Sequence, residues 1–144
     1  MTEALAALEA TALAQHLKAS RWTYPLVNAG HVAGIALLLG AVVPMNLRRL
    51  GWVTGPDPAA VVAFLRPFAV AGLVLAAGCG ALLFIAQAGD YAANLWFRLK
   101  MGLLALAMVN AAWHLGALPS RGVAALSLAL WPLVLISGRM IGYS

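Results

Sequence analysis

Four long stretches of mostly apolar residues, separated by short polar segments, dominate the pattern of this chain. They cover about residues 22–48, 60–87, 95–118 and 122–142. Each reaches the roughly 20 apolar residues that an α-helix needs to cross about 30 Å of hydrocarbon. Short connections make neighbouring helices antiparallel. The pattern therefore predicts an all-α integral membrane protein, an up-down bundle of four transmembrane helices that fills residues 1–144 as a single domain.

A shorter amphipathic segment comes before the first predicted span. Over residues 1–19, leucines such as Leu5, Leu8 and Leu17 recur at roughly helical spacing, with charged residues such as Glu9 between them. This spacing is typical of a helix that lies on the membrane surface. The segment lacks the uninterrupted apolar run of a signal peptide, so we expect the protein to retain it.

Composition agrees with a lipid environment. Hydrophobic residues make up 64% of the chain and charged residues 9%, whereas soluble domains are about 25% charged. The formal net charge is +5, but the Lys and Arg residues stand at predicted helix ends, where they reach lipid head groups. We therefore expect the lipid bilayer, and no nucleic acid, as a partner. The nine cations divide four against five between the two membrane sides, so their count does not orient the protein.

Polar residues collect near one predicted membrane surface. Tyr24, Asn28 and His31 lie on one face of the first span, and cations stand at the start of the third span and the end of the fourth. The candidate cofactor-binding residues are Tyr24, Asn28, His31, Arg98, Lys100 and Arg139. An imidazole, a phenol and three cations suit the propionates of haem b, a quinone head group or a lipid phosphate. Alternatively, the cations reach head groups and His31 makes only an interhelical hydrogen bond.

The candidate metal ligands are His31, His114, Met101 and Met140. At 1.5 Å rise per residue, His31 and His114 differ in depth by roughly 12 Å, so they cannot hold one haem iron together. A haem on His31 would need Met101, Met140 or the His31 of a second copy in a homodimer as its other ligand. Thioether and imidazole also suit Cu(I), although methionine at apolar positions is commonly core packing.

Several short motifs along the chain carry a family resemblance. They are Tyr24-Pro25 followed by His31 and Gly34, Leu47-Arg48, Phe97-Arg98-x-Lys100, Asn110 to His114, Leu126-Ser127-Leu128 with Trp131, and Gly138-Arg139-x-x-x-Tyr143. With this set the chain resembles a small family of bacterial four-helix inner-membrane proteins, distantly similar to the copper-resistance D membrane proteins. The resemblance implies a multi-pass inner-membrane protein with its N-terminus in the periplasm, and no established activity. Asn46 departs from the acidic residue usual in that family, which puts a proton or cation role there in doubt.

These observations predict a small inner-membrane protein with a redox-linked site that binds b-type haem or a quinol. Two alternatives stay open, a non-catalytic structural subunit of a larger membrane complex and a copper-handling membrane protein. Whether the chain is an enzyme also stays open. Gly72, Ala76 and Gly80 repeat every four residues, and such a smooth face favours close helix packing. We therefore expect either a homodimer or a place in a larger complex.

Overall fold

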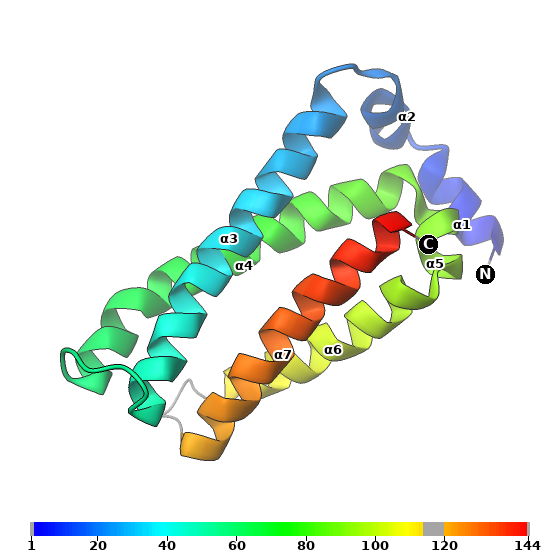
Figure 1. The fold of residues 1–144 in the computed structure, drawn as a ribbon. Coiled ribbons are helices and arrows are strands. Elements are labelled where there is room, and N and C mark those ends of the chain that lie inside the picture. The colour runs from blue at the N-terminus through cyan, green and yellow to red at the C-terminus, as the bar shows by residue number, and fades with distance from the viewer. Residues whose placement is uncertain (1, 114–119, 144) are drawn as a thin grey trace.

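The computed structural model describes residues 2–113 and 120–143, and every regular element within these ranges is helical. The elements are α1 (Thr2–Glu9), α2 (Ala12–Ala19), α3 (Thr23–Leu50), α4 (Pro58–Ala86), α5 (Ala88–Ala93), α6 (Leu95–Ala112), α7 (Arg121–Met140) and the 3-10 turn η1 (Ile141–Tyr143). Helices α3, α4 and α6, and α7 with η1, are long and apolar enough to cross a membrane (Figure 1). The prediction of an all-α membrane bundle is confirmed, and the protein is a multi-pass membrane protein.

Short polar side chains mark where the spanning helices begin. Asp57, Asn94 and Ser120 accept hydrogen bonds from backbone N–H groups in the first turns of α4, α6 and α7, which stabilises helix starts. Helix α3 continues through Pro44 and ends at Leu50. The next residue, Gly51, has a φ of 80°, in the left-handed region that favours glycine. Within the described residues α6 ends at Ala112, and the rest of the predicted third span lies largely in residues 114–119, outside the described part.

Helices α3 and α4 pack with their backbones almost in contact. A Cβ atom on Gly34 would lie 2.5 Å from the backbone nitrogen of Ala76, and one on Gly72 would lie 2.5 Å from the backbone nitrogen of Leu38. No side chain fits at either position. The small-residue face predicted on α4 is therefore used, at least in this part, for packing within the chain.

The buried core joins all four long helices in only one half of the bundle. It consists of Leu38, Ala41, Val42, Ala69, Ala107, Leu130 and Trp131. These residues lie at mid-span or toward the end that holds the α3–α4 turn. Toward the other end, α3 and α7 diverge, and this end also holds α1, α2, α5 and both labelled chain ends (Figure 1).

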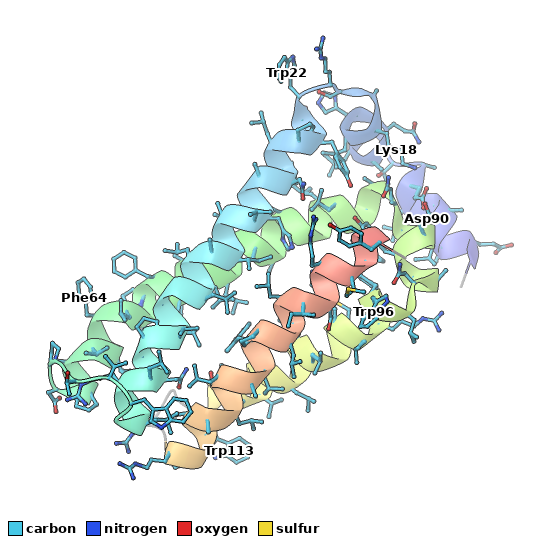
Figure 2. All side chains as sticks on the ribbon, in the orientation of Figure 1. Lys18, Trp22, Phe64, Asp90, Trp96 and Trp113 are labelled. Atoms are coloured by element: carbon cyan, nitrogen blue, oxygen red, sulfur yellow. The ribbon has the colours of Figure 1, made fainter. Side chains whose placement is uncertain are left out.

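The segment before the first span forms two helices, where the sequence predicts one. Thr11 separates them, since its backbone is extended and its hydroxyl accepts a hydrogen bond from the first turn of α2. Ala14 and Leu17 of α2 are buried, so this pair of helices docks on the bundle in addition to any contact with lipid. Trp22, which follows, is 69% exposed and points away from the bundle (Figure 2).

Glu9 attaches this docked pair to α5. Its Oε2 lies 2.7 Å from the Lys18 ammonium, and its Oε1 accepts a hydrogen bond of 2.8 Å from the Gly89 backbone N–H. The hydrogen bonds from Lys18 and Gly89 hold the pKa of the Glu9 carboxyl below its usual range. The contact joins residues 80 positions apart in sequence.

Candidate functional site

His31 lies between α3 and α4 on a surface that a glycine leaves open. Its Nδ1 is 2.7 Å from the carbonyl oxygen of Ala76. A Cβ on Gly80, one turn further along α4, would lie only 3.0 Å from the His31 ring. Gly80 therefore gives the imidazole access to the Ala76 carbonyl. Because a carbonyl oxygen only accepts, the proton of this bond is on Nδ1, and in the neutral ring Nε2 keeps its lone pair.

Lys100 lies on α6, which packs with α7 as a second helix pair beside the α3–α4 pair. Like His31, it lies against a glycine. Its side chain runs across Gly138 of α7, where an added Cβ would lie 3.2 Å from Nζ. The half-buried ammonium is within electrostatic range of His31. Both side chains thus come to one end of the bundle from different helix pairs, each seated on a glycine.

Within residues 2–113 and 120–143 no carboxylate side chain is positioned to neutralise Lys100. The four acidic residues of the chain are Glu3, Glu9, Asp57 and Asp90, and none lies inside a spanning helix. Apart from the Asp57 cap at the start of α4 they stand at the α1–α2–α5 end. Within the described residues the one ion pair joins Lys18 to Glu9. A cation inside a membrane protein is costly unless it meets an acceptor or faces a polar path, so the Lys100 ammonium is suited to an oxygen-bearing ligand.

An aromatic cluster lies about one helical turn nearer to the α4–α5–α6 connection than Gly80 and Lys100. The rings of Phe84 and Phe97 stack with centroids 5.3 Å apart, and Tyr91 of α5 lies 5.5 Å from Phe97. Phe84 is one turn beyond Gly80, and Phe97 one turn before Lys100. This stack brings α4 and α6 together next to the candidate site. Burial, reinforced by a hydrogen bond with the Tyr24 hydroxyl, raises the pKa of Tyr91 to about 12, so the phenol stays protonated at neutral pH.

The other predicted cofactor-binding residues are directed elsewhere. Arg98 donates from Nε to the Ala92 carbonyl oxygen at 2.9 Å. Arg139 donates to the Tyr143 hydroxyl at 2.8 Å and lies over its ring. Asn28 is exposed, and Tyr24 bonds to Tyr91, as described above. Of the predicted set, His31 and Lys100 lie at the same end of the bundle and within electrostatic range of each other.

The predicted metal ligands are more scattered. Met101 is 46% exposed and Met140 is partly buried, while His114 lies outside the described residues. Over residues 2–113 and 120–143 there is no group of three or more His, Cys, Asp or Glu residues that could hold a metal ion. Haem and copper at His31 therefore stay predictions.

Sequence reasoning placed Gly80 on a packing face and Gly138 in a motif, but it did not predict that they border His31 and Lys100. It also missed the aromatic cluster. Gly80 and Phe84 stand four residues apart, and Phe97 and Lys100 three apart, so each pair shares a helix face. That spacing was a usable signal. The contact between Gly138 and Lys100 could not be predicted, because nothing in the sequence specifies which helices are neighbours at this depth in the bundle.

Comparison of the chain with family models, with curated proteins and with solved structures found no match.

Proposed function

We propose that the protein binds the head group of a membrane quinone between His31 and Lys100, as a redox-linked function. One observation carries the proposal. The His31 Nε2, with Nδ1 held by the Ala76 carbonyl, is left as an acceptor within electrostatic range of the Lys100 ammonium. A quinone ring carries two oxygens on opposite sides, and the donor and the acceptor on different helix pairs are the groups that could bind them.

The chemistry of the pair suits both redox forms of the ligand. Lys100 donates a hydrogen bond to a quinone carbonyl oxygen and stabilises negative charge that develops there on reduction. Nε2 of His31 accepts the hydrogen bond of a quinol hydroxyl. The stacked Phe84 and Phe97 rings offer an apolar wall against which a flat ring packs.

The route to the site is from the bilayer. Helices α3 and α7 diverge toward the end that holds the start of α3 and the end of α7 (Figure 1), and a quinone carries an apolar tail that stays in lipid. We place the protein in the bacterial inner membrane with its N-terminus in the periplasm. In this orientation the site lies near the periplasmic face.

A b-type haem is the second candidate, and the same hydrogen bond favours it. Histidines that ligate metals usually donate their other ring N–H to a carbonyl or carboxylate, which fixes the ring. Nε2 of His31 would then be one axial ligand. The second would come from Met101, Met140 or His31 of a second copy in a homodimer.

Spectra and extraction separate these functions. The detergent-purified protein is examined by a reduced-minus-oxidised visible spectrum and metal analysis, and a solvent extract of the same sample is assayed for quinone. Co-purified quinone without iron supports the first proposal. A sharp α-band with stoichiometric iron supports haem, and bound copper supports copper handling. A colourless protein with neither quinone nor metal, which also fails to bind added quinone, overturns the redox proposals and leaves the structural-subunit alternative.

Variants test the assigned residues. His31→Ala and Lys100→Met are each expected to lower bound quinone at least roughly tenfold, since each removes a hydrogen bond to the head group. His16→Ala and Arg21→Met are the matched controls, because they make the same kind of change at exposed positions on the same side of the membrane. Equal losses in the controls would mean that the effect is not specific to the site.

A further inference from the structure

A cavity lies in the half of the bundle away from His31. Its volume is about 120 Å³, and residues of all four spanning helices line it. The walls are largely apolar, but Asn46 of α3 and Ser127 of α7 bring polar atoms to it. Each of these two residues is only 3% exposed.

The two polar side chains leave hydrogen-bonding capacity unused. Nδ2 of Asn46 donates to the Val42 carbonyl oxygen at 2.8 Å and to the Ser127 hydroxyl oxygen at 3.1 Å, which uses both amide hydrogens. Within the described residues nothing donates to Oδ1 of Asn46, and no oxygen accepts the Ser127 hydroxyl hydrogen. A buried acceptor or donor left unpaired carries a free-energy penalty. The cavity therefore favours an occupant that both donates and accepts hydrogen bonds.

The depth of the cavity favours water over lipid as that occupant. Asn46 is four residues from the end of α3 and Ser127 six residues from the start of α7, so both lie roughly 6–9 Å from helix ends. Arg66 also lines the cavity. An acyl chain supplies neither a donor nor an acceptor. About four water molecules fit, at about 30 Å³ each.

We propose that this cavity is a hydrated binding site for small molecules that donate and accept hydrogen bonds, water first, and that it opens to the membrane face carrying the α3–α4 turn. Asn46 Oδ1 accepts from the occupant and the Ser127 hydroxyl donates to it. The site lies on the face opposite to His31 and stands independently of the quinone proposal.

Thiol labelling tests the hydration. A thiol reacts with a methanethiosulfonate only as the thiolate, which forms in water and not in lipid. In a Cys79→Ser background, Ser127→Cys is exposed to aminoethyl methanethiosulfonate, and the adduct is followed by intact mass. Ala129→Cys, exposed on the same helix, is the lipid-facing control, and Val53→Cys, in the α3–α4 turn, is the aqueous control. We expect Ser127→Cys to react roughly tenfold faster than Ala129→Cys.

A variant that fills the cavity tests whether labelling of Ser127→Cys depends on the cavity. Val62 lines the cavity and is only partly buried, so Val62→Phe is expected to fill space there and slow labelling of Ser127→Cys at least several-fold, with Val53→Cys unaffected. If Ser127→Cys reacts no faster than Ala129→Cys while circular dichroism shows native helicity, the cavity is dry or filled by lipid and the proposal is wrong. Labelling that Val62→Phe leaves unchanged also overturns it, because the reagent would then arrive by another route.

Discussion

A Cβ atom on Gly34 would lie 2.8 Å from the carbonyl oxygen of Gly72, and a Cβ on Gly72 would lie 2.8 Å from the carbonyl oxygen of Gly34. This reciprocal contact sets the closest approach of α3 and α4. Because both obstructing atoms belong to the backbone, neither can move aside without separating the helices. In the same helix pair the ring of His31 packs against Gly80, so the position of the imidazole depends on the contact between Gly34 and Gly72.

Gly72→Ala is therefore expected to destabilise the protein by about 1–3 kcal/mol, the usual cost of forcing extra volume into a packed interface. Gly78→Ala is the matched control on the same helix, because an added Cβ at Gly78 meets nothing within 4 Å. Thermal unfolding in one detergent, followed by circular dichroism, compares them. Because alanine forms helices better than glycine, Gly78→Ala should not lower the melting temperature. An equal change in both variants would show that the α3–α4 contact is not responsible.

Gly80→Ala is expected to change the site while the fold stays intact. The new methyl group would lie 3.0 Å from Cε1 of His31, so the ring must shift and its bond to the Ala76 carbonyl weakens. We expect about a tenfold loss of quinone affinity, the equivalent of one hydrogen bond. Gly102→Ala, where an added Cβ meets nothing within 4 Å, controls for the change of residue type. Unchanged affinity in Gly80→Ala would argue that the orientation of His31 does not matter for binding.

The bond between Asn46 and Ser127 makes a prediction about stability. Ser127→Ala leaves one amide hydrogen of the buried Asn46 without its acceptor and is expected to cost about 1–3 kcal/mol. The double variant Asn46→Leu with Ser127→Ala removes both polar groups, and its loss should be smaller than the sum of the two single losses. Unfolding free energies of the four proteins in the cycle measure the coupling. Additive losses would mean that the two side chains do not interact.

The Glu9 contact predicts loss of docking in acid. The folded-state pKa of Glu9 is held below its ordinary value of about 4.3. The contact therefore stabilises docking of α1–α2 above that value, and the stabilisation is lost as the pH falls through the lower folded-state pKa. The amide chemical shift of Gly89, followed by NMR during an acid titration, should report this midpoint. In Glu9→Gln the transition should be absent, and a transition that persists there would belong to another group.

Hydropathy alone predicted the spans, because lipid requires each one to be continuously apolar and helical. It could not predict that residues 1–19 fold back on the bundle. Their leucine spacing is the same for a helix on lipid and for one packed on protein, and the deciding contact, from Glu9 to Gly89, joins positions 80 residues apart.

From the sequence, only the approximate depth of the candidate site along the helices could be predicted. The predicted topology placed His31, Lys100, Arg98 and Arg139 near one membrane surface. The direction in which each side chain points could not be predicted from the sequence. Arg139 turns to Tyr143, four residues along, and Arg98 to the Ala92 carbonyl. Lys100 turns inward, because Gly138 leaves room for its chain.

The link between Glu9 and Gly89 also has a consequence for biogenesis. Glu9 is made early, but its partner follows α4 in the chain, so the contact cannot form before both α3 and α4 have crossed the bilayer. Until then α1 and α2 stay undocked on their side of the membrane. Its docking is thus a late step of assembly, and it can succeed only in chains whose first two spans have inserted as an antiparallel pair.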